Sequence, residues 1–215
     1  MDLLPLVVHL GILAAAVVLH EVGHGVVAYG CGDTTAAEQG RLTLNPLRHI
    51  DPVGTLLLPG LLLVSAWAMG VRPMLFGWAK PVPIDARRLG HPRRDMALVA
   101  AAGPLVNFLL AALGVIGLRM GLGIEGLTGA LVRITSGATI GINCVLGVVN
   151  LLPILPLDGG RVLASLLPRR LARSYARLER VGLLIVLLLF TQTSIVSTIV
   201  TPVLESFLSL AAGSR

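Results

Sequence analysis

The chain has 215 residues, of which 55% are hydrophobic and only 13% are charged. Its mean hydropathy is +0.87. So little charge combined with long apolar runs is typical of an integral membrane protein rather than a soluble domain. The formal net charge of +6 does not indicate a nucleic-acid-binding protein, because the basic residues gather in short links between apolar runs, as they do in cytoplasmic loops.

Long apolar runs divide the chain at nearly regular intervals. They fall at about 3–30, 53–71, 96–118, 134–157 and 181–200, and a shorter one follows at 203–212. Each of the first five approaches the roughly 20 residues with which an α-helix crosses a bilayer. The sequence therefore predicts an all-α integral membrane protein, a polytopic helical bundle that forms a single membrane-embedded domain over residues 1–215.

The charge of the links predicts how these helices are oriented. The links 31–52, 72–95 and 161–180 are basic, whereas the link 119–133 carries only two arginines. By the positive-inside rule the first three links are cytoplasmic. Both links that flank 53–71 then lie on one side of the membrane, and Pro59-Gly60 interrupts that run. We therefore expect a re-entrant segment at 53–71, with a complete span as the alternative.

The link GRLTLNPLRHIDP alternates apolar and polar residues at Leu42, Thr43 and Leu44. Such alternation is typical of a β-strand, and we expect a small β-hairpin on the cytoplasmic side. Two roles are open for it. It either covers the cytoplasmic mouth of the bundle or offers an edge strand that pairs with an extended peptide.

The first apolar run contains the motif H-E-x-x-H, formed by His20, Glu21 and His24. Residues four apart lie on nearly the same side of a helix, so the two imidazoles can bind one zinc ion. Glu21 lies about 100° around the helix axis, where its carboxylate can act as general base toward a water that the metal activates. A chance match is the alternative, but in an apolar helix ionisable groups need partners and are usually functional.

Two imidazoles and a water leave a tetrahedral zinc ion one ligand short. Acidic residues are scarce in the apolar runs, and the clear candidate is Asp158, within NLLPILPLDGG at residues 150–160. The prolines of this stretch prevent a regular helix, and its paired glycines allow a sharp turn and a close backbone approach. Asp158 is either the third ligand or the cap of the following helix, and its apolar setting favours ligation.

The two motifs together carry a family resemblance. H-E-x-x-H followed by N-x-x-P-x-x-x-L-D-G-G, present here without departure from Asn150 to Gly160, resembles the site-2 proteases, which are intramembrane zinc metalloproteases. The stretches GRLTLNPLRHIDPVGT, FGWAKPVPID and AAGPLVN also resemble bacterial members. The chain is identified as a compact member of this family, with no residues left over for a PDZ domain or a pair of CBS domains.

The resemblance implies a catalytic site and its cofactor. One catalytic Zn²⁺ is expected on three ligands, His20, His24 and Asp158. Glu21 is expected to be the catalytic acid and base. Asn150 is expected to hydrogen-bond the substrate carbonyl, and an amide that only packs helices is its alternative.

The resemblance also implies the kind of substrate and where it is cut. The expected reaction is hydrolysis of a peptide bond in a transmembrane segment near the cytoplasmic leaflet of a prokaryotic inner or plasma membrane. A single-span membrane protein or a signal-peptide remnant is the expected substrate, in regulated proteolysis or in remnant clearance. No nucleic acid is expected as a partner, and the oligomeric state does not follow from the sequence.

A zinc transporter, or another metal-binding membrane protein without proteolytic activity, is the alternative function. It predicts several sets of ligands along a path, whereas this chain has one concentrated set with a glutamate in the position of the base. Asn107 and Asn143 are two further amides within the apolar runs. Either could contact the substrate, but hydrogen bonding between helices is the expected role.

Overall fold

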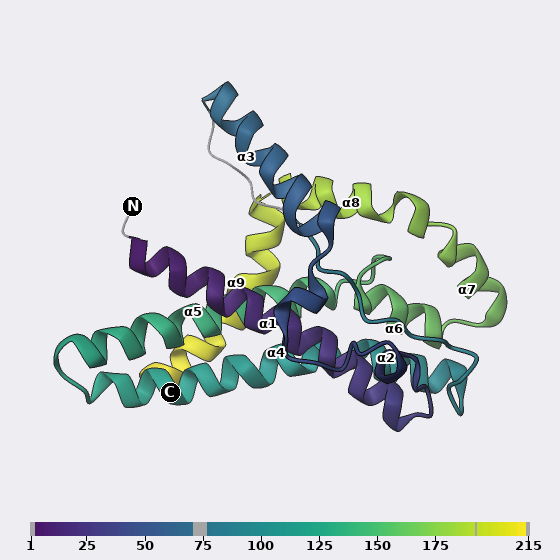
Figure 1. The fold of residues 1–215 in the computed structure, drawn as a ribbon, viewed down its shortest axis with the longest axis horizontal. Coiled ribbons are helices and arrows are strands. Elements are labelled where there is room, and N and C mark those ends of the chain that lie inside the picture. Colours follow the sequence, from purple (N-terminus) through teal and green to yellow (C-terminus); the bar gives the residue numbers. More distant parts are fainter. Residues whose placement is uncertain (1–2, 71–76, 192, 214–215) are drawn as a thin grey trace.

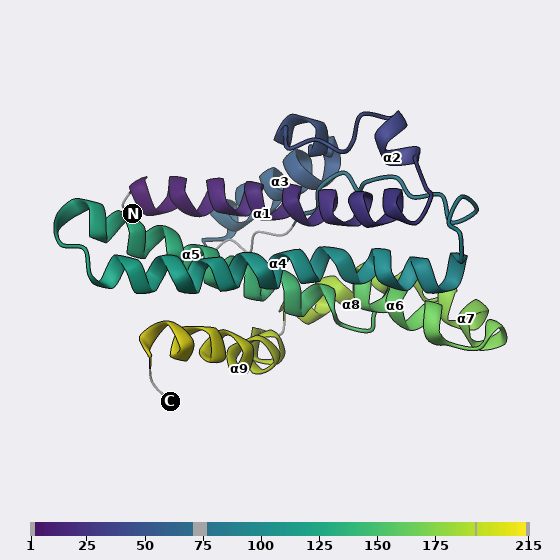
Figure 2. The ribbon, with the colours of Figure 1, turned by 90° about the horizontal axis from the view of Figure 1, so that it is seen from below.

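The computed structural model describes residues 3–70, 77–191 and 193–213, and these residues form an all-helical molecule. Three long helices run side by side at its centre: α1 (Leu3–Gly30), α4 (Pro92–Leu122) and α5 (Gly126–Asn150). Each is antiparallel to the one before it, and α4 contacts both α1 and α5 (Figures 1 and 2). This arrangement places the second halves of α1 and α5 and the first half of α4 at the same end of the bundle.

Four helical segments are long and apolar enough to cross a membrane: α1, the segment Pro52–Met69, α4 and α5. Most of the α1 surface is exposed leucine, valine and alanine. In water such a surface would be costly, whereas in a bilayer it contacts lipid. The fold is therefore that of a multi-pass membrane protein.

The helices that follow α5 lie on the lower side of the molecule in the view of Figure 2. Residues 151–157 form an irregular loop, and α6 (Asp158–Leu166), α7 (Arg169–Ala176), α8 (Glu179–Thr191) and α9 (Thr193–Ala212) come next. The helix α9 packs on α4 and α5 through a small apolar cluster of Ala111, Val115, Ile140, Cys144 and Ala211. The run predicted at 134–157 thus ends as a helix at Asn150, because the prolines beyond it cannot continue the backbone bonding.

The predicted cytoplasmic-side β-hairpin is wrong, because no strand occurs among the described residues. The link instead contains a short 3₁₀-helix, η1 (Pro46–His49), which begins where the Asn45 side chain accepts a bond from the Leu47 N–H. Leu42 lies against Gly25 of α1, whereas Leu44 is 66% exposed. The apolar–polar alternation therefore reflects local packing on α1 rather than the two faces of a sheet.

The chain does not reverse at Pro59-Gly60, which lies within a continuous helical segment. The re-entrant course of 53–71 stays a prediction, and the two ends of the segment lie together, because the Trp78 N–H donates a bond of 3.2 Å to the Gly54 carbonyl oxygen. Residues Pro52–Leu57 form a π-helical turn, η2, that passes directly into α3 (Leu58–Met69). Pro59 falls at the junction of η2 and α3, where the backbone bonding changes from the π-helical to the α-helical pattern. Figure 1 shows α3 pointing away from the bundle as one straight helix.

Candidate metal centre

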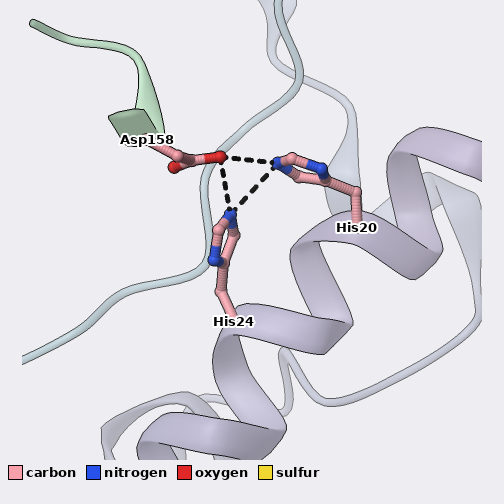
Figure 3. A group of neighbouring side chains, drawn as sticks. All are labelled: His20, His24 and Asp158. Carbon is pink, nitrogen blue, oxygen red and sulfur yellow. Dashed lines mark hydrogen bonds and ion pairs between the residues drawn. The ribbon is translucent and has the colours of Figure 1, made fainter. Parts of the chain in front are cut away.

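The structure brings His20, His24 and Asp158 together between α1 and the start of α6 (Figure 3). The Nε2 atoms of the two histidines are 3.1 Å apart, and they lie 3.1 and 3.3 Å from Oδ2 of Asp158. All three side chains are buried. The spacing of four residues on α1 places both imidazoles on one side of the helix, as the sequence predicts.

Asp158 reaches the histidines because the loop 151–157 folds tightly against the first turn of α6. A Cβ atom added to Gly159 would lie 2.6 Å from the Leu152 carbonyl oxygen, and one added to Gly160 would lie 2.5 Å from the Leu155 nitrogen. Neither glycine has a positive φ. The glycine pair therefore serves close backbone approach rather than the sharp turn that the sequence also allowed.

Both imidazoles are held from behind by hydrogen bonds to α4. Nδ1 of His24 lies 2.7 Å from the Val99 carbonyl oxygen, and Nδ1 of His20 lies 2.6 Å from Oδ1 of Asn107. A neutral imidazole carries one proton, and these bonds place it on Nδ1 of each ring. The Nε2 lone pairs of both rings therefore face Asp158.

A metal ion fits this arrangement better than protein atoms alone. Oδ2 of Asp158 is enclosed and receives no hydrogen bond from the residues that the structure describes. Two nitrogen lone pairs and a carboxylate oxygen would repel one another unless a cation lay among them. Zinc bonds of about 2.0–2.1 Å in a tetrahedron separate neighbouring ligand atoms by about 3.3 Å, and the three observed separations are close to that distance.

Glu21 lies next to this group on α1 and contacts a different segment of the chain. Its Oε2 accepts a hydrogen bond of 2.8 Å from the backbone N–H of Val82. The Glu21 side chain is half-buried, so part of it stays accessible while the bond from Val82 restricts its movement. Its placement beside the histidines, with one oxygen fixed by Val82, suits a group that exchanges protons at the metal centre.

The segment that carries Val82 is anchored on both sides. The buried guanidinium of Arg41 donates a bond of 2.7 Å to the Lys80 carbonyl oxygen, and the Asp85 N–H donates a bond of 2.7 Å to Asp33. Burial raises the pKa of the Asp33 carboxyl, but the bonds from Thr35 and Asp85 lower it by more, so the pKa lies below its ordinary value. Asp33 is therefore a carboxylate at neutral pH and holds this segment beside Glu21.

Asn150 is the last residue of α5 and is half-buried. Its amide nitrogen donates a bond of 2.9 Å to the Leu146 carbonyl oxygen one turn earlier. Among the described residues it makes no hydrogen bond to His20, His24 or Asp158. The structure thus places Asn150 just before the loop that leads to Asp158, without a hydrogen bond to the three grouped side chains.

Sequence reasoning missed the part that α4 takes in this centre. Val99, Gly103 and Asn107 are spaced four apart, so they lie on one face of α4, and that face meets His20 and His24. The signal was present in AAGPLVN, where a glycine and an asparagine stand one helical turn apart. It could be interpreted only once the antiparallel register of α1 and α4 was known.

The comparisons with known proteins agree with this geometry. Residues 128–191 match the model of "Peptidase family M50". "Putative zinc metalloprotease YwhC" of Bacillus subtilis is 37% identical over 198 residues, which cover 90% of this chain and 84% of the relative. The chain belongs to peptidase family M50. The resemblance to the site-2 proteases is thereby confirmed, and the protein is a membrane zinc metallopeptidase.

More distant M50 relatives occur in mycobacteria. "Putative zinc metalloprotease Rip2" of Mycolicibacterium smegmatis is 33% identical over 178 residues, and the protein of the same name in Mycobacterium tuberculosis H37Rv is 32% identical over 173 residues. These matches cover 80% of this chain in both cases but only 61% and 62% of the relatives. No solved structure matches the chain.

Gly103 provides a direct test of where the M50 metal lies. A Cβ atom at this position would lie 2.6 Å from Nε2 of His20 and still closer to Nε2 of His24. We expect Gly103→Ala to place a methyl group in the space between the imidazoles. Overpacking costs about 1–3 kcal/mol, and about 1.4 kcal/mol is a tenfold change in affinity, so zinc should bind about 5- to 100-fold more weakly.

The measurement is a zinc titration of the purified protein against a competing chelator. Gly141→Ala on α5 is the matched control, because a Cβ atom there meets nothing within 4 Å, and it should bind zinc like the wild type. Unchanged zinc affinity in Gly103→Ala would show that the metal does not occupy this space.

Proposed function

We propose that this M50 peptidase is an intramembrane endopeptidase that cuts a peptide bond of a transmembrane segment near the cytoplasmic leaflet. The observation that carries the proposal is the position of the metal centre. Two of its grouped side chains lie on α1, a helix apolar enough to span the bilayer, and all three are buried. A peptidase site inside a membrane-spanning bundle acts on substrate that is itself within the membrane.

The distribution of charge supports a cytoplasmic location for this site. The half of the bundle that holds His20 and His24 is flanked by a large set of arginines, namely Arg87, Arg88, Arg93, Arg94, Arg169, Arg170, Arg173 and Arg177. Within the described part of the chain, the opposite turn, between α4 and α5, has only Arg119 and Arg133 near it, and both donate bonds to backbone carbonyls. By the positive-inside rule the arginine-rich end is cytoplasmic.

The protein's own residues divide the proposed chemistry among them. His20, His24 and Asp158 would hold the zinc ion, which when bound polarises the scissile carbonyl and activates the attacking water. Glu21 accepts the proton of that water and then donates a proton to the departing amine. The Val82 N–H keeps one Glu21 oxygen in place while the other remains available for the proton.

Asn150 is proposed to stabilise the oxygen of the scissile carbonyl as negative charge develops on it. Its amide has two hydrogens, and one is used on the Leu146 carbonyl. The second hydrogen can be donated to substrate that enters beside the loop 151–157. This role is exercised only when substrate is bound, because the Asn150 side chain makes no hydrogen bond to the three grouped residues.

The same geometry supports a proposal for the substrate class. A transmembrane helix has every backbone carbonyl in an internal hydrogen bond, so it must unwind locally before a carbonyl can reach the centre. Single-span membrane proteins and the remnants of signal peptides are the candidates, since each has one apolar helix that can unwind near its end without breaking contacts with other helices. Glycine, proline or other helix-weakening residues near the cut should favour cleavage.

The proposal is tested by mapping a cleavage site. A single-span membrane protein with tags at both ends is incubated with the purified enzyme in liposomes, and the fragments are identified by mass spectrometry. We expect a cut within the apolar segment, in its cytoplasmic half, that a zinc chelator suppresses and added zinc restores. Cleavage confined to residues outside the apolar segment would contradict intramembrane proteolysis.

A further inference from the structure

Two fully buried asparagines connect the metal centre to the core of the bundle. Asn107 on α4 and Asn143 on α5 are 0% and 1% exposed. Nδ2 of Asn107 donates a bond of 2.8 Å to Oδ1 of Asn143, and Nδ2 of Asn143 donates a bond of 2.9 Å to the Thr139 carbonyl oxygen. With the bond from His20 to Asn107 they form a continuous chain from a metal-facing imidazole to the backbone of α5.

The direction of every bond in this chain is fixed by its last member. The Thr139 carbonyl can only accept a hydrogen bond, so Asn143 must present its NH₂ group there and its oxygen to Asn107. Asn107 must in turn present its NH₂ group to Asn143 and its oxygen to His20. His20 therefore has to donate from Nδ1, which leaves the lone pair on Nε2, the atom that faces Asp158.

His24 reaches the same tautomer by a different route. Its Nδ1 donates to the Val99 carbonyl oxygen, a backbone group that no side-chain substitution removes. The tautomer and ring orientation of His20 depend instead on two side chains from two other helices. Of the two histidines, only His20 therefore depends on other side chains for the tautomer that can bind metal. We call the hydrogen-bonded pair Asn107 and Asn143 the side-chain relay.

The free-energy cost of burying two amides indicates that Asn107 and Asn143 do more than pack the helices together. Two buried amides would each lose hydrogen-bonding partners if the chain were broken, and an unsatisfied buried polar group costs about 1–3 kcal/mol. An apolar side chain would pack these helices without that risk. The amides satisfy one another and His20 with directed bonds, which is what a relay needs and what helix packing alone does not.

We propose that Asn107 and Asn143 are positioning residues that hold His20 as the Nδ1–H tautomer with its Nε2 aimed at the zinc position. Asn107 acts directly on the imidazole, and Asn143 acts through Asn107. Hydrogen bonds behind a metal-binding histidine typically contribute about 10–100-fold in metal affinity. This inference rests on the proposed ligand role of His20.

The test measures zinc affinity and the spectrum of the cobalt-substituted protein in detergent. Asn107→Leu removes the acceptor for His20 and keeps the number and branching of the side-chain heavy atoms. We expect zinc to bind about 10–100-fold more weakly and the cobalt absorption bands to shift, because one imidazole is no longer fixed. Asn107→Asp keeps an oxygen toward Nδ1 of His20 but sets its second oxygen against Oδ1 of Asn143, so it should retain only part of the affinity that Asn107→Leu loses.

Two further variants separate positioning from packing. Asn143→Leu leaves His20 its direct partner but frees the Asn107 amide to rotate, so a smaller loss of zinc affinity is expected. Ser136→Ala removes a different buried polar group at the contact of α4 and α5 and should leave zinc affinity and spectrum unchanged. It is the matched control for packing between these helices.

Several results would overturn the relay. One is wild-type zinc affinity and an unshifted cobalt spectrum in Asn107→Leu. Another is an equal loss in Asn107→Leu and Ser136→Ala, which would assign the effect to packing. If Asn107→Leu does not fold, unchanged affinity in Asn143→Leu overturns the proposal in its place. A loss of zinc in the ligand variants of His24 and Asp158, without one in Asn107→Leu, would reject the relay alone and leave the proposed function intact.

Discussion

Replacing Glu21 by glutamine is expected to leave zinc bound and to lower the cleavage rate of a membrane substrate by about 10²–10⁴-fold. That range is the usual contribution of a positioned general acid or base. Glutamine has nearly the shape of glutamate, and its Oε1 can still accept the bond from the Val82 N–H. The variant therefore loses the proton acceptor while the local structure is kept.

The measurement pairs the cleavage rate in liposomes with the zinc content of the same sample. Glu38→Gln is the matched control, because Glu38 lies in the exposed helix α2 (Thr35–Glu38), where it pairs with Arg88 away from the metal centre. The control should cleave at the wild-type rate. Normal cleavage by Glu21→Gln would reject Glu21 as the base, and loss of its zinc would show that the residue supports the metal instead.

Removal of a proposed ligand, unlike Glu21→Gln, is expected to remove the zinc as well as the cleavage activity. His24→Ala and Asp158→Ala should each lose zinc, by more than the roughly 10–100-fold in affinity that changes behind a ligand cause, and should lose cleavage with it. Each variant takes away one of the three atoms that converge within 3.1–3.3 Å. With two protein ligands left, a zinc ion has too few bonds to remain in place.

Zinc content of the purified variants, together with affinity measured by chelator competition, checks this prediction. His9→Ala is the matched control on the same helix, because His9 is exposed and its Nδ1 bonds to the Pro5 carbonyl oxygen. Unchanged zinc in both ligand variants would mean that the metal is bound elsewhere. A loss in only one of them would reduce the ligand set accordingly.

Local sequence patterns predicted the helical bundle but also predicted a hairpin that the structure does not have. The membrane-spanning helices follow from apolar composition, which acts on each segment separately. The hairpin in GRLTLNPLRHIDP was wrong because alternation of side chains does not create a strand without a neighbouring strand to pair with. The helical course through Pro59-Gly60 was not predicted, because the chain enters α3 from the π-helical turn η2, which has no signature in the sequence pattern.

The same contrast holds within the metal centre. His20 and His24 lie together because four residues make about one turn of α1, a relation that is local and readable from the chain. Asp158 was identifiable because carboxylates are scarce in apolar segments. The bond from Val82 to Glu21 and the anchor at Arg41 could not be predicted, since they join segments about 40–60 residues apart through backbone groups that carry no sequence signature.

By itself the sequence determined which residue types are available for chemistry and which helices carry them. The tertiary structure decided which residues of other helices pack against them and hydrogen-bond to them. The register of α4 against α1 sets Gly103 in the space between the imidazoles and Asn107 against His20, and the packing of α5 adds Asn143. A register is a sum of many weak packing contacts along two whole helices, so no short motif encodes it, although it fixes how the histidines point.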